Sequence, residues 1–149
     1  MAGHRVEAAV HPAVRERDLP RLVRADKGWW ARENPASAYP GSGDPNGISR
    51  QAIAIINELR SNPFLGNAWE GRSDRFESLT GCRRVAFDRH GWNGKPRYRL
   101  VYRLFPDEDL PELVWVICVE RRADMSAYQV SQGRLPVDPA DLPSSHDWR

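Results

Sequence analysis

The sequence lacks the features that mark several common protein classes. It has only two cysteines, Cys82 and Cys118, which lie far apart inside strand-like runs, and this is neither a disulfide framework nor the spacing of a metal site. No apolar run approaches the roughly 18 residues of a membrane-spanning helix. We therefore expect two reduced thiols in a core, with no metal, no small-molecule cofactor and no membrane partner.

Residues 1–10 also lack the basic segment, long apolar stretch and small-residue cleavage site of a secretory signal. We therefore expect a cytoplasmic protein. The chain has 149 residues, of which 40% are hydrophobic and 28% charged. This length and composition are typical of one globular domain.

Positive charge is unevenly distributed, although the formal net charge is only +2. Residues 83–103 contain seven basic residues against the single acid Asp88. The basic residues are Arg83, Arg84, Arg89, Lys95, Arg97, Arg99 and Arg103. Such a concentration is typical of a surface that binds a polyanion, because phosphate contacts supply most non-specific affinity for nucleic acid. A solvated face of a sheet explains the charge equally well.

The first third of the chain predicts a strand, a helix and a loop. Residues 5–10 alternate loosely, as a strand does. Residues 15–32 have partly helical apolar spacing, with Asp18 as a candidate N-cap and proline in the first turn. The stretch 34–47 is rich in proline, glycine and serine, so it predicts an inserted loop.

A second helix is predicted from position 48 onward. Its apolar stripe consists of Ile48, Ala52, Ile55, Ile56 and Leu59. This spacing is typical of an amphipathic helix. Ser49 or Asn46 is the candidate cap, and the helix is expected to stop near Asn62-Pro63.

The remaining chain predicts three strands and a short helix. The strand-like runs are 81–89, 97–104 and 113–120, and the helix covers 124–135. Consecutive strands joined by short turns pair antiparallel, so we expect an α+β fold with the N-terminal strand and two helices packed on one face of a small antiparallel sheet. The expected domain is 1–135, followed by a proline-rich tail at 136–149.

The strand at 97–104 carries arginine at Arg97, Arg99 and Arg103. Side chains alternate between the two faces of a strand, so these arginines are expected on the face opposite the apolar and aromatic residues between them. Three arginines on one strand face repel one another unless an anion neutralises them. A bound polyanion is therefore a natural partner for this face.

Two segments, RYRLVYRL and VICVERRADMSAYQVSQGRL, carry a resemblance to a known family. The first has a strand of the form Tyr-Arg-apolar-Val-Tyr, and the second has an apolar strand, a basic turn, and a tyrosine six residues beyond the turn arginine. In order and spacing they resemble the C-terminal strand motifs of the RelE/ParE toxin superfamily. The resemblance covers roughly residues 48–135 and implies a RelE/ParE-like fold.

The resemblance to the RelE branch implies the toxin of a type II toxin-antitoxin system, which acts as a ribosome-dependent mRNA endoribonuclease. Its partners would be a cognate antitoxin, mRNA and the ribosome. The matched catalytic positions are Arg99, Arg122 and Tyr128. The reaction is an attack of the RNA 2′-hydroxyl on the phosphodiester without a metal, with guanidiniums stabilising the phosphoryl charge. Nucleic-acid contacts would come from Arg83, Arg84, Arg89, Lys95, Arg97, Arg103 and Arg121.

Other interpretations stay open. Glu120 stands where the family commonly has glycine; it would either pair with Arg121 or Arg122 and weaken phosphate binding, or act as a base. The spacing of Tyr128 alone favours a residue that packs the last helix on the sheet, whereas the family resemblance favours the catalytic role. The alternative functions are a ParE-like inhibitor that acts by binding DNA gyrase, and an inactive fold relative that binds a partner or nucleic acid.

Overall fold

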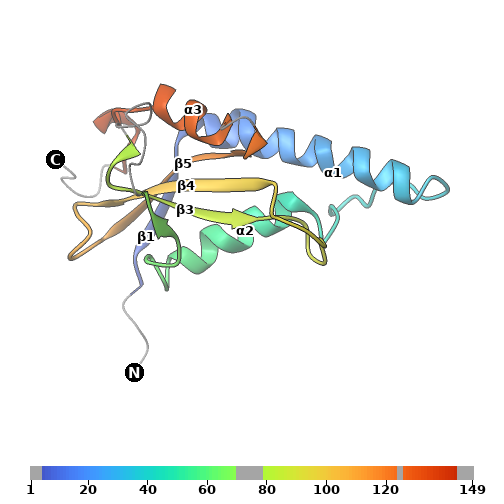
Figure 1. Cartoon of the computed structure of the whole chain (residues 1–149), viewed down its shortest axis with the longest axis horizontal. Helices are drawn as coiled ribbons and strands as arrows, with labels where there is room; N and C mark the ends of the chain where they lie inside the picture. The colour runs from blue at the N-terminus through green and yellow to red at the C-terminus, as the bar shows by residue number, and fades with distance from the viewer. Residues whose placement is uncertain (1–4, 70–78, 124–125, 144–149) are drawn as a thin grey trace.

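The computed structural model describes residues 5–69, 79–123 and 126–143 (Figure 1). In chain order its elements are β1 (Glu7–Val10), η1 (Val14–Asp18), α1 (Leu19–Glu33), α2 (Ile48–Leu59), β2 (Asn67–Ala68), β3 (Cys82–Phe87), β4 (Tyr98–Phe105), β5 (Leu113–Arg121), α3 (Ser126–Gly133) and η4 (Pro139–Asp141). Within these ranges, none of the helices combines the length and apolar character that a membrane span requires.

The strands form one five-stranded sheet in the order β1-β5-β4-β3-β2. Strands β3, β4 and β5 pair antiparallel, as predicted, and the short strand β2, which was not predicted, pairs antiparallel with β3. Strand β1 pairs with β5 in parallel, with Glu7 opposite Leu113. The predicted α+β fold is thus confirmed, but the sheet is mixed. Helices α1 and α2 separate β1 from the other strands in the sequence, so β1 is not joined to its partner β5 by a short turn and can run parallel to it.

Helices cover both faces of the sheet (Figure 1). On one face Leu22 of α1 and Ala52 of α2 share a buried cluster with Leu100 and Val116 of the sheet. Because the other face packs against α3, it has its own buried cluster, which includes Val101, Trp115, Cys118, Ala127 and Tyr128. The two predicted helices therefore lie on the same face, and the C-terminal helix lies on the opposite face.

Helix α2 takes its N-terminal cap from α1. The Asp26 carboxylate accepts hydrogen bonds from the Ile48 and Ser49 backbone N–H groups, at 2.8 and 3.1 Å, and from the Ser49 hydroxyl at 2.8 Å. Gly47 permits this approach, because a Cβ at that position would lie 2.7 Å from the Asp26 carboxylate. The predicted caps, Ser49 and Asn46, were therefore wrong, because the carboxylate of Asp26, which is distant in sequence, accepts the hydrogen bonds of the helix N-terminus.

Asp18 was also expected to be an N-cap, and it is not. The chain is already helical at η1, before Asp18 is reached, and no cap hydrogen bond forms. Asp18 is fully buried and accepts a hydrogen bond from the Val119 N–H at 2.9 Å and two from Arg134 at 2.6 and 2.8 Å. Arg134 also donates to the Ile117 carbonyl at 2.9 Å. Asp18 and Arg134 therefore provide hydrogen-bond partners for the backbone groups of β5 that lie beyond the end of its neighbour β1.

Strand β5 contains a bulge that determines which way its last residues face. Val101 lies opposite Cys118 and Tyr102 opposite Val116, so Ile117 is the extra residue. Ile117 and Cys118 both pack on the α3 side, and Val119 returns to the α1–α2 side. Glu120, which follows, consequently faces the α3 side with Arg99 as its cross-strand partner.

Both cysteines are free and buried, as predicted. Burial raises the pKa of Cys82 to about 11, and it raises the pKa of Cys118 further. Both thiols therefore stay protonated at neutral pH.

Candidate functional site

The α3 side of the sheet has a partly exposed region beside α3, here called the open surface. It consists of Arg84 and Ala86 of β3, Arg99 of β4 and Glu120 of β5. Ala86 lies opposite Arg99, and Arg99 lies opposite Glu120. Cross-strand partners share a face, so these residues form one continuous patch. Arg122, which is exposed, follows the end of β5 at its border.

Arg99 is held in place by its own strand. Its Nη1 donates to the carbonyls of Pro96 and Tyr98, at 3.0 and 2.8 Å. In the described part of the chain its guanidinium contacts no carboxylate. It therefore keeps N–H groups that are available to an anion.

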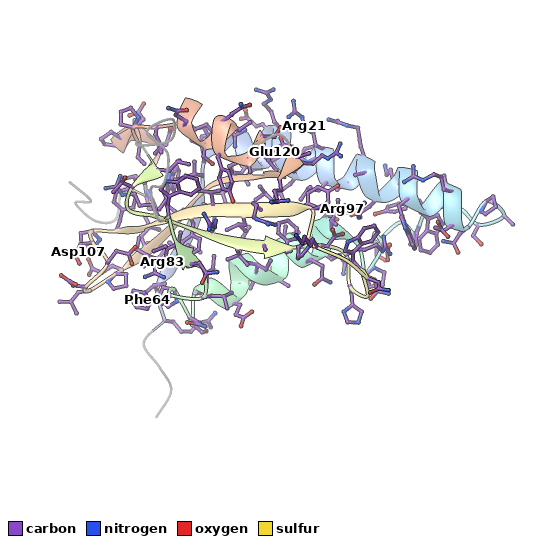
Figure 2. All side chains as sticks on the ribbon, in the orientation of Figure 1. Arg21, Phe64, Arg83, Arg97, Asp107 and Glu120 are labelled. Atoms are coloured by element: carbon purple, nitrogen blue, oxygen red, sulfur yellow. The ribbon has the colours of Figure 1, made fainter. Side chains whose placement is uncertain are left out.

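Pairing with Arg121 or Arg122 was one of the two possibilities left open for Glu120, but its carboxylate pairs with Arg21 of α1, at 3.1 Å (Figure 2). Its other oxygen accepts a hydrogen bond from the Arg121 backbone N–H, at 3.0 Å. The partner differs because the end of β5 lies beside η1 and α1, held there by Asp18. The Arg122 side chain consequently has no carboxylate partner among the described residues.

Tyr128 lies in the core rather than on the open surface. It is 6% exposed, and its ring centroid is 4.8 Å from that of Trp69. The Arg84 guanidinium lies over both rings, 5.2 Å from Trp69 and 5.9 Å from Tyr128. Of the predicted basic residues, Arg84 is therefore the one placed directly against this tyrosine.

The stack of Arg84 on Trp69 and Tyr128 could not be read from the sequence. Trp69 directly follows the two-residue strand β2, inside a connector whose composition predicts no strand. Its position depends on the pairing of β2 with β3 and on the Trp69 N–H, which donates to the Cys82 carbonyl at 2.9 Å. Neither contact has a local signature.

Two of the predicted nucleic-acid contacts, Arg83 and Arg89, pair with acids of the chain instead. Arg83 pairs with Glu108 at 3.0 Å. Arg89 pairs with Asp44 at 3.1 Å. The guanidinium of Arg89 also lies 3.2 Å from the ring centroid of Trp29, a cation–π contact. These arginines already hold structural partners.

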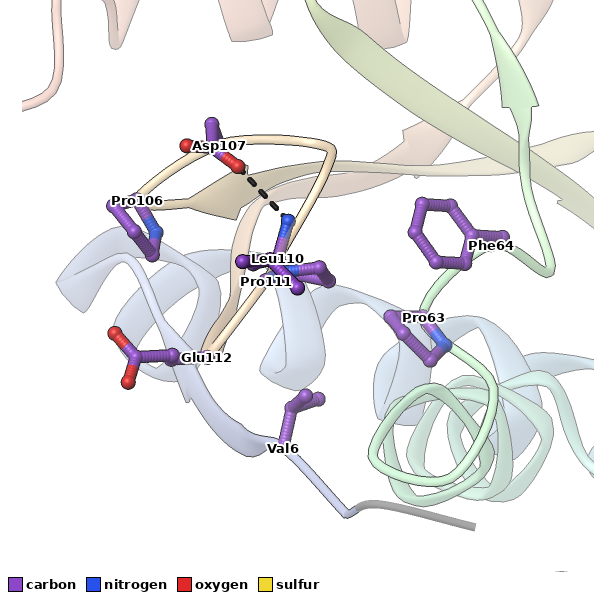
Figure 3. A pocket seen from close by; sticks show the side chains of 8 residues that line it. All are labelled: Val6, Pro63, Phe64, Pro106, Asp107, Leu110, Pro111 and Glu112. Atoms are coloured by element: carbon purple, nitrogen blue, oxygen red, sulfur yellow. Dashed lines mark hydrogen bonds between the residues drawn. The ribbon is translucent and has the colours of Figure 1, made fainter.

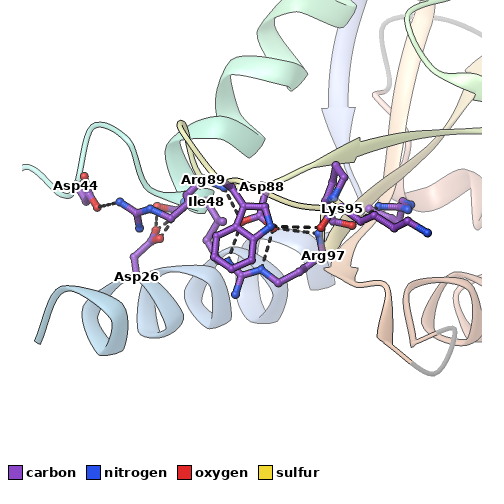
Figure 4. Close-up of polar contacts among 11 residues, drawn as sticks. Asp26, Asp44, Ile48, Asp88, Arg89, Lys95 and Arg97 are labelled. Carbon is purple, nitrogen blue, oxygen red and sulfur yellow. Dashed lines mark hydrogen bonds and ion pairs between the residues drawn. The ribbon is translucent and has the colours of Figure 1, made fainter. Parts of the chain in front are cut away.

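Arg97 does not lie in a row with Arg99 and Arg103 along β4, although this was expected. It binds Asp88 with two side-chain hydrogen bonds of 2.8 Å, and its guanidinium stacks 3.6 Å from the ring centroid of Trp92 (Figure 4). Burial alone would raise the pKa of Asp88, but hydrogen bonds from Arg97 and from the Arg89 backbone outweigh it and hold the pKa below its ordinary value. On the α3 side of β4, Val101 also separates Arg99 from Arg103, because it packs against α3.

The remaining predicted contacts are less constrained. Lys95 and Arg121 are exposed. The Arg103 guanidinium lies 5.5 Å from the Phe105 ring centroid, beside Cys82 in the register. Among the described residues, no cluster of histidine, cysteine or carboxylate side chains is arranged to hold a metal ion.

An apolar cavity of about 640 Å³ lies at the turn between β4 and β5 (Figure 3). It is bordered by Phe64 and Leu110, which are 47% and 79% exposed. None of the basic residues predicted from the sequence lines it.

The fold has a counterpart among solved structures. The mixed sheet with helices on both faces is an α+β fold, and this fold is RelE-like. The particular match is the E. coli toxin RelE, in the free state and with two arginines replaced by alanine: the TM-score is 0.50 at 14% identity, over 89% of this chain and 99% of that chain. No family model and no curated protein matches. The resemblance inferred from the sequence is thus confirmed for the fold.

Proposed function

We propose that this chain is the toxin of a type II toxin-antitoxin system and acts in the cytoplasm as a ribosome-dependent mRNA endoribonuclease. The observation that carries the proposal is the open surface on a RelE-like fold, where Arg84, Arg99 and the neighbouring Arg122 have no carboxylate partner among the described residues. A cognate antitoxin would neutralise the toxin by covering this basic surface.

The proposed reaction needs groups that stabilise charge on a phosphate. The RNA 2′-oxygen forms a bond to the adjacent phosphorus as the bond to the 5′-oxygen breaks, leaving a cyclic phosphate and a 5′-hydroxyl. Arg99 and Arg122 bind the phosphoryl oxygens, where negative charge develops. The 2′-hydroxyl loses a proton and the 5′-oxygen gains one, and Tyr128 is the candidate for proton transfer, with the Arg84 cation beside its ring.

A second candidate function is inhibition by binding, as in a ParE-like gyrase inhibitor or a relative without nuclease activity. The observation that favours it is the burial of Tyr128, which is 6% exposed. A tyrosine packed in the core suits a structural role, and a binding inhibitor needs no proton-transfer group.

The test is cleavage of mRNA on programmed ribosomes by the purified chain. We expect the wild type to cleave, and Arg99→Ala, Arg122→Ala and Tyr128→Phe each to lower the rate by about a hundredfold or more. The matched control is Arg17→Ala, which removes an exposed arginine from η1 and should retain the wild-type rate.

Several outcomes would contradict the nuclease. An unchanged rate in the Arg122→Ala, Tyr128→Phe double variant removes the proposed site. Intact mRNA together with gyrase-linked DNA breaks selects the binding inhibitor. Glu120→Gln tests the carboxylate separately: a rate equal to that of the wild type means that Glu120 is not the base.

A further inference from the structure

A second basic region lies on the other side of β4 from the open surface. There a cavity of about 310 Å³ opens between α1, the start of α2 and the ends of β3 and β4. Four arginines contribute to its lining: Arg24, Arg32, Arg89 and Arg97. The cavity shares no residue with the open surface, so it is a separate site.

Two of these arginines have no partner for their guanidinium groups among the described residues. Arg24 and Arg32 of α1 are exposed, and their guanidiniums have no hydrogen-bond or carboxylate partner within the described ranges. They lie eight residues apart with Gly28 midway, so all three share one face of the helix. A Cβ at Gly28 would lie 3.5 Å from Arg32 Nη1, so the Arg32 guanidinium lies close over this glycine.

The other two arginines that line the cavity are paired with aspartates. Arg89 is bound to Asp44 and stacked on Trp29, and Arg97 is bound to Asp88 (Figure 4). The carboxylate that lines the cavity, that of Asp26, faces the N-terminus of α2 and accepts three hydrogen bonds there. Its charge is thereby balanced by the helix end.

The cavity also contains a hydrogen-bond donor that the described residues leave unpaired. Tyr98 lines it and is 7% exposed, and its hydroxyl has no hydrogen-bond partner in the part of the chain that the structure describes. Burial raises the pKa of Tyr98, so the phenol remains protonated and able to donate. The hydroxyl is not one of the buried, unpaired polar atoms of the described residues, so it is open to solvent in the cavity and can donate to a ligand there.

We propose that this cavity binds a phosphate group carried by a ligand of nucleotide size. Arg24 and Arg32 bind the phosphate oxygens with charge-assisted hydrogen bonds, and the Tyr98 hydroxyl donates a third. The Trp29 side chain forms an aromatic wall for the attached sugar or base. The volume lies at the lower end of the range for small-molecule sites, which excludes a double helix. The inference does not depend on the proposed nuclease.

Calorimetric titration of the purified full chain tests this site with inorganic phosphate, adenosine 5′-monophosphate, adenosine and a five-nucleotide single-stranded RNA. We expect saturable binding of the monophosphate, weaker binding of phosphate and none of adenosine. In the Arg24→Gln, Arg32→Gln double variant, the affinity for the monophosphate should fall by about tenfold or more. Tyr98→Phe should lower it by about threefold, because one neutral hydrogen bond is lost.

The matched control is the Arg15→Gln, Arg17→Gln double variant, which removes the same charge from exposed positions of η1. It should bind the monophosphate within about twofold of the wild type, since its charges lie outside the cavity. An equal loss in both double variants would overturn the proposal in favour of diffuse charge attraction. Absence of saturable phosphate binding by the wild type would overturn it as well.

The RNA arm identifies the source of the phosphate. Tighter binding of the oligonucleotide than of the monophosphate, lost in the Arg24→Gln, Arg32→Gln variant, assigns the cavity to an RNA chain. Equal or weaker binding of the oligonucleotide assigns it to a free nucleotide. Either result supports a phosphate site. Retained mRNA cleavage by this variant would leave the proposed function intact, so the two proposals fail separately.

Discussion

Three arginines beside the sheet, Arg89, Arg97 and Arg134, here called the rim arginines, differ from the arginines of the open surface in what they contact. At the rim, Arg89, Arg97 and Arg134 each bind an aspartate whose side chain is no more than 4% exposed. At the open surface, Arg84 and Arg99 have no such partner among the described residues, nor does Arg122 at its border. Within the basic stretch 83–103, Arg84 and Arg99 belong to the open surface and Arg89 and Arg97 to the rim.

This difference separates structural from available charge. A buried carboxylate is stable only with a cation and further hydrogen bonds, so its arginine is committed to the fold. An arginine that contacts only rings or carbonyls retains donors for a ligand. The arginines that are candidates for function are therefore those without a carboxylate partner. The number of arginines in a stretch of sequence does not identify them.

The largest effect is expected where the rim pair is most buried. Asp18→Asn leaves Arg134, which is 10% exposed in the pair, without its counter-charge, and should lower the free energy of unfolding by about 3–5 kcal/mol. Urea unfolding at neutral pH measures this value. Asp109→Asn, at an exposed position in the β4–β5 turn, is the control and should change little. A loss below about 1 kcal/mol for Asp18→Asn would mean that the pair does not hold the edge of β5.

A smaller loss is expected at the next rim pair. Asp44→Asn removes the partner of Arg89, which is 9% exposed but keeps its cation–π contact with Trp29. The free energy of unfolding should fall by about 1–3 kcal/mol, because one charge-assisted hydrogen bond is lost and the cation is partly compensated. The Asp44→Asn, Arg89→Met double variant should recover part of the loss. No recovery would show that Asp44 acts through its hydrogen bond to the Asn46 N–H instead.

The elements were predictable because their signals are local. Period-two patterns placed β3, β4 and β5, and the apolar stripe placed α2. The failures all depend on partners distant in sequence: the cap from Asp26, the parallel pairing of β1, and the bulge at Ile117. No window of the sequence contains these contacts.

The candidate site follows the same division. Alternation correctly placed Arg99 opposite the apolar face of β4. It did not reveal that Arg97 turns to Asp88, although that acid was visible as the only one in the basic stretch. The burial of Tyr128 follows from the packing of α3 on Trp69, which lies outside any motif.

A weaker and pH-dependent effect is expected at the most exposed rim pair. Asp88→Asn should cost about 1 kcal/mol at neutral pH, because Arg97 is 43% exposed and solvent screens the pair. The pKa of Asp88 is lowered in the folded state, so its contribution is present above the unfolded value, near 4, and is lost as the pH falls through the lower folded value. Unfolding curves of wild type and variant should therefore converge in acid. A constant difference down to about pH 2 would contradict this ionic role.

The smallest effect on stability is expected at the border of the open surface. Arg122→Ala removes an exposed side chain without a partner among the described residues, so the free energy of unfolding should change by less than about 0.5 kcal/mol. The same preparation should nevertheless lose mRNA cleavage, since the guanidinium is proposed to bind the phosphoryl oxygens. Urea unfolding and the ribosome assay on one sample separate the two quantities. A loss of stability similar to that of Asp44→Asn would place Arg122 among the structural arginines and remove it from the site, because an arginine that the fold requires cannot be assigned to the substrate from a loss of activity alone.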